Sequence, residues 1–225
     1  MMQIIPAVLA TSEQQYREDI NKLVLSKSFS EGWVHIDLAD NKFVQNQTID
    51  PEIIQKFPTN LRKEAHLMMK HPMQTIYKLI NLQFNRVIIH IESDNMRSGP
   101  VDYIRDELWD LEEAQIESGL AIKPGTSLSW LEPYFNEVDV VLIMSIEPGF
   151  QGQPFIDDSL GKVKQLVKMR SNGNYQFKIG VDGGVKDKNV KQIADAGADY
   201  LVVGSYLFQG DGDIDKNLEK LRKAL

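Results

Sequence analysis

The chain has 225 residues, of which 42% are hydrophobic and 25% charged, and it carries a formal net charge of -7. This composition is ordinary for a soluble globular protein, and the length suits one domain of about 200–250 residues. The acidic balance disfavours nucleic acid as the main partner, because a negative surface repels phosphate backbones. Cys is absent, which excludes disulfides, a thiolate nucleophile and a Cys-ligated metal.

No export or membrane segment is predicted. The first residues, MMQIIPAVLATSEQ, lack a basic start, and their apolar run is too short for a signal peptide. No stretch of the sequence reaches the roughly 18 apolar residues that a membrane span needs. We therefore expect a cytoplasmic protein with no membrane partner, and the sequence leaves homo-oligomerisation open.

Short apolar runs alternate with longer amphipathic stretches along the chain. The runs are rich in Val, Ile or Leu, are as long as buried strands, and lie at residues 4–9, 33–40, 62–69, 86–92, 119–123, 140–146, 178–184 and 200–205. Helical patterns lie between them, for example at 13–25 and 190–198, and a last helix is expected at 213–225. Strands that alternate with helices imply parallel pairing. Eight such units in this length predict an α/β fold, a closed (β/α)8 TIM barrel with residues 1–225 as one domain.

Four polar side chains fall on predicted strands and form a candidate metal site. His35 and Asp37 are two residues apart and so share one face of the second strand. His66 comes near the end of the third strand and Asp182 near the end of the seventh. Two imidazoles and two carboxylates suit Zn²⁺, Fe²⁺, Co²⁺ or Mn²⁺ better than Mg²⁺. An acid/base site without a metal is the alternative, and a lone strand His is commonly a buried residue with a hydrogen-bond partner. For His90 we expect a pocket-wall or hydrogen-bonding role.

Glycine-rich loops follow three consecutive predicted strands and form a candidate phosphate site. They contain Gly149 to Gly152, the pair Gly183 and Gly184, and the pair Gly204 and Ser205. Backbone N–H groups of such turns bind phosphate well, and the loops after the last two strands of a barrel are a frequent phosphate site. Tight turns without a ligand are the alternative, since Gly serves turns in any case.

Five motifs, in order and over nearly the whole chain, resemble those of the ribulose-phosphate 3-epimerase family. They are HIDLADNKFVQNQT (35–48), EAHLMM (64–69), IMSIEPGFQGQPFI (143–156), VDGGV (181–185) and AGADYLVVGSYLF (196–208). The resemblance implies a barrel of the ribulose-phosphate-binding type. It also implies that the candidate site holds one divalent metal ion and that Asp37 and Asp182 are the catalytic acid/base pair. The residues that it places against the substrate are His66, Met68, Met144, Gly149, Phe150, Gln151, Gly152, Gly183, Gly184, Gly204 and Ser205.

The chain departs from the family pattern near the sugar-hydroxyl end of the expected pocket. Ala7 replaces the usual Ser, which removes a substrate contact, and Ala39 replaces a Met, which is expected to open room beside the reacting carbons. Asn41 stands in place of a Gly, and because Asn tolerates a positive φ we expect that turn to survive. The other departures are Lys42, Gln45, Glu64, Gly180 and Lys123.

The expected function is metal-dependent epimerisation at the third carbon of a ketose phosphate. The first hypothesis is interconversion of D-ribulose 5-phosphate and D-xylulose 5-phosphate, in which one carboxylate serves each face of the carbon. The departures leave open another ketose phosphate, such as D-allulose 6-phosphate. A non-catalytic sugar-phosphate-binding protein is the alternative from another class, and the presence of both carboxylates argues against it.

Overall fold

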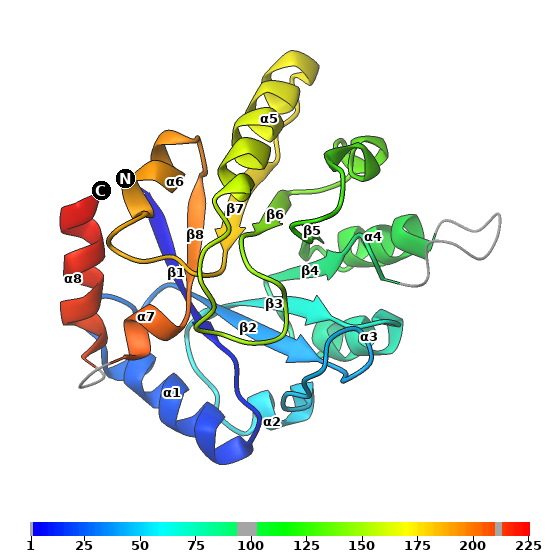
Figure 1. The fold of residues 1–225 in the computed structure, drawn as a ribbon. Helices are drawn as coiled ribbons and strands as arrows, with labels where there is room; N and C mark the ends of the chain where they lie inside the picture. Colours follow the sequence, from blue (N-terminus) through cyan, green and yellow to red (C-terminus); the bar gives the residue numbers. More distant parts are fainter. Residues whose placement is uncertain (1, 94–102, 210–212) are drawn as a thin grey trace.

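Eight parallel strands close into a barrel in the order of the sequence, with the last strand paired to the first. The computed structural model describes residues 2–93, 103–209 and 213–225. The strands lie around one central axis with the helices outside them (Figure 1). They are β1 (Gln3–Val8), β2 (Trp33–Ala39), β3 (Arg62–Met68), β4 (Arg86–His90), β5 (Glu117–Ile122), β6 (Val140–Met144), β7 (Lys178–Asp182) and β8 (Tyr200–Val203).

All eight predicted strands are present, and the predicted TIM barrel is confirmed. The main differences are at the ends. Gly183–Gly184 and Gly204–Ser205, which the predicted runs included, lie beyond β7 and β8, and β5 begins two residues earlier than expected. The prediction of a single domain over residues 1–225 includes positions outside the described ranges and stays a prediction.

Helices cover the outside of the barrel in most of the crossovers. The α-helices are α1 (Glu13–Leu25), α2 (Pro51–Gln55), α3 (Met73–Asn81), α4 (Tyr103–Glu113), α5 (Asp158–Gly173), α6 (Val190–Asp195), α7 (Ser205–Phe208) and α8 (Ile214–Ala224). Two short 3-10 helices, η2 (Leu128–Trp130) and η3 (Glu132–Tyr134), follow β5. The helix predicted at 13–25 is confirmed with its bounds, and those at 190–198 and 213–225 are present but shorter. None of the helices in the described ranges is long and apolar enough to cross a membrane.

Local sequence accounts for where the first and last helices begin. Ser12 precedes α1 and its hydroxyl accepts a hydrogen bond from the N–H of Gln15 at 3.2 Å. Asp213 caps α8 in the same way by accepting from the N–H of Lys216 at 3.0 Å. Such caps satisfy N–H groups that have no partner within the helix.

The barrel wall separates two hydrophobic cores. The larger lies between the strands and the surrounding helices. The smaller fills the barrel interior with buried side chains of β1, β4, β5, β6 and β8 and contacts Trp33 of β2. Alternation along a strand puts His35 and Asp37 on the inner side, above this apolar filling. His35 and Asp37 therefore lie inside the barrel, with Asp37 nearer the carboxyl end of β2.

Candidate metal centre and substrate pocket

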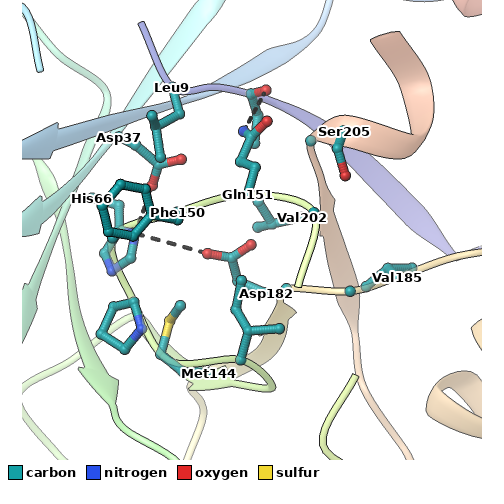
Figure 2. A pocket seen from close by; sticks show the side chains of 18 of the residues that line it. Leu9, Asp37, His66, Met144, Phe150, Gln151, Asp182, Val185, Val202 and Ser205 are labelled. Carbon is teal, nitrogen blue, oxygen red and sulfur yellow. Dashed lines mark hydrogen bonds and ion pairs between the residues drawn. The ribbon is translucent and has the colours of Figure 1, made fainter. Parts of the chain in front are cut away.

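Four buried side chains from three strands gather inside the barrel mouth. His35 and Asp37 come from β2, His66 from β3 and Asp182 from the end of β7. Each offers one nitrogen or oxygen atom, and these atoms all lie within 4.8 Å of one another. In Figure 2 the side chains of Asp37, His66 and Asp182 point toward one another. The structure thus brings together all four residues that the sequence predicted as metal ligands.

Asp37 lies between the two imidazoles and Asp182 stands slightly apart. The Oδ1 atom of Asp37 is 2.9 Å from Nδ1 of His66 and 3.3 Å from Nε2 of His35. The Oδ2 atom of Asp182 is 3.8 Å and 4.0 Å from the same two nitrogens. Side-chain exposure is 7% for Asp37 and 13% for Asp182, whereas both imidazoles are inaccessible.

The two carboxylates have pKa values that differ in direction. Burial disfavours the charge on Asp37, but its close contacts with the imidazoles of His35 and His66 outweigh burial and hold the pKa of Asp37 below its usual range. Burial also disfavours the charge on Asp182, and with repulsion from Asp37 it raises the pKa of Asp182 to about 6 against the attraction of the imidazoles. The same pocket therefore holds one strongly ionised carboxylate and one that takes up a proton more readily.

The donor set could hold a divalent cation. The Nε2 atom of His35 is buried and has no hydrogen-bond partner, although it faces Asp37 and Asp182. An orphaned buried nitrogen is costly, and coordination to a cation at the centre of the cluster would satisfy it. Two nitrogen and two carboxylate ligands match Zn²⁺, Fe²⁺, Co²⁺ and Mn²⁺. A divalent charge would also offset the two buried carboxylates.

The other nitrogen of each imidazole has a partner outside the cluster. The Nδ1 atom of His35 lies 2.5 Å from Oε1 of Glu64. The Nε2 atom of His66 lies 2.9 Å from Nε2 of His90, whose Nδ1 lies 3.1 Å from Glu92. Burial lowers the pKa of His90 to about 4, so its ring is neutral and accepts from one neighbour while donating to another. Both inner imidazoles are thereby oriented toward Asp37, with Nδ1 of His66 within hydrogen-bonding distance of it and Nε2 of His35 without a hydrogen-bond partner.

His90, predicted to be a pocket-wall or hydrogen-bonding residue, lies within hydrogen-bonding distance of His66. The sequence marks Glu64 as a departure from the family pattern but predicts no structural role for it, and it does not single out Glu92. Glu92 comes two residues after His90, a spacing that puts both side chains on the same face of an extended chain. This spacing is the signal that could have found it.

A pocket of about 470 Å³ opens above the four polar residues. It is lined by the predicted residues Asp37, His66, Met68, Met144, Gly149, Phe150, Gln151, Gly152, Asp182, Gly183, Gly184, Gly204 and Ser205. His35 lies below it and does not line it. Ala7, which the sequence marked as a departure at a substrate contact, also lines it, and the residues added by the structure are Leu9, Ile146, Pro148, Val185, Val202 and Tyr206. Figure 2 shows Gln151, Val202 and Ser205 on the side of the pocket away from His66.

The glycine loops after β6, β7 and β8 form one wall of this pocket. Gly183 and Gly184 have φ angles of +111° and +62°, conformations that other residues adopt at a cost. The Ser145 hydroxyl donates within this turn, at 2.7 Å from the carbonyl oxygen of Gly183 and 2.8 Å from that of Asp182. The structure thus places the predicted phosphate loops beside the polar cluster, and their role as a phosphate site stays a prediction.

Two departures from the family pattern turn out differently in the structure. Asn41 has a φ of +56°, so the expected left-handed turn is present without Gly. Ala39 is buried and does not line the pocket, so the room expected beside the reacting carbons stays a prediction. Thr48 binds the backbone of Ala39, accepting from its N–H through the hydroxyl at 2.9 Å and donating its own N–H to the Ala39 carbonyl at 3.2 Å. Ala7, in contrast, does line the pocket.

Comparison with known proteins decides the family. The model of the ribulose-phosphate 3 epimerase family matches residues 3–208. The chain belongs to this family. The ribulose-phosphate 3-epimerase of Aquifex aeolicus is 36% identical over 194 residues, which cover 85% of this chain and 84% of the relative. The Escherichia coli K12 enzyme of the same name is 29% identical over 225 residues, covering 99% and 95%. As a member of the ribulose-phosphate 3-epimerase family, the chain is an isomerase that acts on a carbohydrate.

Solved structures of similar shape support the fold alone. A 3-hexulose-6-phosphate synthase has a TM-score of 0.67 at 14% identity and covers 100% of both chains. The 3-keto-L-gulonate-6-phosphate decarboxylase from Vibrio cholerae has a TM-score of 0.68 at 10% identity, and the match covers 99% of this chain and 96% of that one. The fold of this epimerase-family chain is therefore one that other TIM-barrel enzymes share.

Proposed function

We propose that the chain catalyses the metal-dependent interconversion of D-ribulose 5-phosphate and D-xylulose 5-phosphate. The observation that carries this proposal is the position of Asp37 and Asp182 in one pocket, on strands that are not neighbours in the barrel. Inversion of a carbon requires a base on one face and an acid on the other, and two carboxylates that reach one pocket from separate strands meet that need.

In this reaction the two carboxyl side chains carry out the proton transfers. One carboxylate takes the proton from the third carbon, and the electron pair left behind moves into the adjacent ketone. The other carboxyl group then gives a proton to the opposite face of the same carbon, and the carbonyl forms again with inverted configuration. The reverse reaction exchanges the two roles. A divalent ion held by His35, Asp37, His66 and Asp182 would supply Lewis-acid polarisation of the ketone oxygen.

The remaining pocket residues bind and orient the substrate in this proposal. The glycine loops at 149–152, 183–184 and 204–205 hold the phosphate through backbone N–H groups, which favours phosphorylated over free sugars. Binding energy at the phosphate fixes the distant third carbon between the carboxylates. Met68 and Met144 pack against the reacting carbons with apolar, polarisable side chains.

A second substrate is favoured by one observation. Ala7 lies in the pocket wall where a Ser is usual in the family, so a hydroxyl contact is replaced by space. A longer ketose phosphate such as D-allulose 6-phosphate is the matching candidate.

Solvent-deuterium incorporation tests the reaction. Metal-reconstituted protein is incubated in D₂O with each of several ketose phosphates, and deuterium at the third carbon is followed by NMR. We expect incorporation together with inversion, fastest for D-ribulose 5-phosphate and slow or absent for unphosphorylated ribulose. Absence of exchange with every ketose phosphate would refute the proposal, and faster turnover of the six-carbon substrate would replace the first substrate by the second.

A further inference from the structure

A row of charged side chains crosses the barrel below the candidate metal centre. His35, Glu64, Arg86 and Glu117 are register partners on the consecutive strands β2, β3, β4 and β5. Glu64 is fully buried and Arg86 is 2% exposed, whereas 34% of the Glu117 side chain is accessible. Buried charges are costly unless each is paired and hydrogen-bonded, so the row must be well connected to persist.

Each oxygen of the Glu64 carboxylate serves a different partner. Its Oε1 atom lies 2.5 Å from Nδ1 of His35, and its Oε2 atom accepts from Nη1 of Arg86, also at 2.5 Å. The Nε atom of Arg86 donates to Oε2 of Glu117 at 2.8 Å. Hydrogen bonds between charged groups are strong and directional. The carboxylate of Glu64 is therefore held in one orientation between a permanent cation and the imidazole.

Aromatic rings hold the guanidinium of Arg86 in place. Its central carbon lies 4.2 Å from the ring centre of Trp33 and 5.5 Å from that of Tyr200. The ring of Tyr200 occupies the space beside Gly180, where an added Cβ would lie 2.3 Å from its Cζ atom. The absence of a side chain at position 180 thus lets Tyr200 pack beside Arg86. Two aromatic rings and two carboxylates therefore hold the Arg86 guanidinium in place beneath the candidate metal centre.

We propose that Glu64 and Arg86 are positioning residues for the metal centre. Arg86 orients the Glu64 carboxylate, which accepts a hydrogen from Nδ1 of His35 and so keeps the lone pair of His35 Nε2 directed at the centre. This inference rests on the proposed function, because it requires that the centre binds a metal ion. It explains the buried Nε2 atom without a partner, since the Glu64–Arg86 pair forces that nitrogen to be the acceptor.

The substitution Glu64→Gln gives an unusual expected result. An amide has one oxygen and one NH₂ group, and Arg86 offers only donors. The oxygen of Gln must therefore face Arg86, which turns the NH₂ group toward Nδ1 of His35. That nitrogen then becomes an acceptor, and the ring proton moves to Nε2, where it blocks coordination. Removing Arg86 as well frees the amide to turn its oxygen back to His35.

Binding of Co²⁺ to the apoprotein tests this, by competition with a chromogenic chelator. Relative to wild type, Glu64→Gln is expected to bind Co²⁺ about 10–100-fold more weakly, the usual cost of losing a partner behind a metal ligand. The double variant Glu64→Gln/Arg86→Met is expected to regain at least about tenfold of that loss. It removes both buried charges, a change that proteins often tolerate. Leu166→Ala is a control: Leu166 lies on the buried face of α5, and its loss should lower the melting temperature without changing the affinity for Co²⁺.

The outcomes separate the two hypotheses. A double variant that binds Co²⁺ as weakly as Glu64→Gln alone overturns the role of Arg86, and unchanged affinity in Glu64→Gln overturns that of Glu64. Wild-type protein that binds no Co²⁺, or a His35→Ala variant that binds it normally, refutes the metal centre itself and this inference with it. Melting temperatures of the metal-free variants show whether each one is folded, so a loss of affinity is assigned only to folded protein.

Discussion

Substitution of Gly184 by Ala tests how the turn after β7 builds the proposed phosphate site. The φ of Gly184 is +62°, and an added Cβ would lie 2.8 Å from the backbone nitrogen and 2.9 Å from the Cα of Phe155. Both contacts are shorter than real Cβ atoms make, and both are to backbone, which cannot rotate away as a side chain would. The turn must therefore shift if Ala is to fit.

The expected cost has two sources. A left-handed conformation costs an L-residue roughly 1–2 kcal/mol. Forcing a methyl group against packed backbone costs roughly 1–3 kcal/mol more. We therefore expect Gly184→Ala to lower the free energy of unfolding by at least about 2 kcal/mol. For a chain of this size that corresponds to a fall in melting temperature of at least about 4 °C. Affinity for inorganic phosphate should fall at least about tenfold, which is 1.4 kcal/mol.

Gly161→Ala is the matched control. Gly161 lies inside α5, and an added Cβ there would have no heavy atom within 4 Å. Because Gly in a helix is less stable than Ala by roughly 0.5–1 kcal/mol, this variant should melt slightly above the wild type and bind phosphate normally. Calorimetric melting and phosphate competition against substrate give both quantities. If Gly184→Ala melted no lower than the wild type while Gly161→Ala behaved as expected, the turn would not have the rigidity that we assign to it.

Three further predictions concern single side chains. In metal-loaded protein, Asp37→Asn and Asp182→Asn should each lower the rate of epimerisation by at least about 10²-fold. At least one of these variants should still exchange substrate hydrogen with D₂O, from one epimer only. Near-normal epimerisation in either variant would refute the two-carboxylate mechanism. Burial opposes the charge on Asp215, but hydrogen bonds, the Ser26 hydroxyl foremost, lower its pKa. The stability that ionised Asp215 contributes is therefore present above its unfolded pKa of about 3.9 and is lost as the pH falls through its lower folded pKa. We expect Asp215→Asn to lower the free energy of unfolding in urea at pH 7 and to lower it much less at pH 2. An equal loss at both values would contradict this. Ser145→Ala removes the hydroxyl bond to the turn after β7 and should cost about 1 kcal/mol in urea unfolding, and no loss would show that the bond contributes nothing.

The barrel and the polar cluster were predictable because both follow from short-range rules. Alternation along a strand is set by covalent geometry, so His35 and Asp37 had to share a face whichever strands flanked them. Parallel strands end at the same edge of a barrel, which brought Asp182 to the same place from 145 residues away in the sequence.

The row of charged side chains beneath the candidate metal centre was not predictable, because it depends on how neighbouring strands are aligned and not on short-range rules. Arg86 begins an apolar run, and an Arg at the start of a strand ordinarily extends to solvent. Its burial depends on the register that puts it beside both Glu64 and Glu117, and register between strands is not written in either strand alone. The hydrogen bonds between Thr48 and the backbone of Ala39 were not predictable for a similar reason, because they depend on the path of the intervening loop.

Aromatic, charged and apolar side chains fill the barrel interior beneath the pocket. Trp33, Arg86 and Tyr200 pack against one another beneath the four polar residues, while the glycine loops and Phe150 surround the opposite end. In the proposed function, a metal ion held by the four polar residues would lie beneath a sugar phosphate bound in the pocket. That arrangement predicts an ordered exchange, in which the ion binds before the sugar phosphate and dissociates after it. A saturating sugar phosphate should therefore slow the removal of a bound ion by a chelator, so that metal retention would be greatest when substrate is abundant.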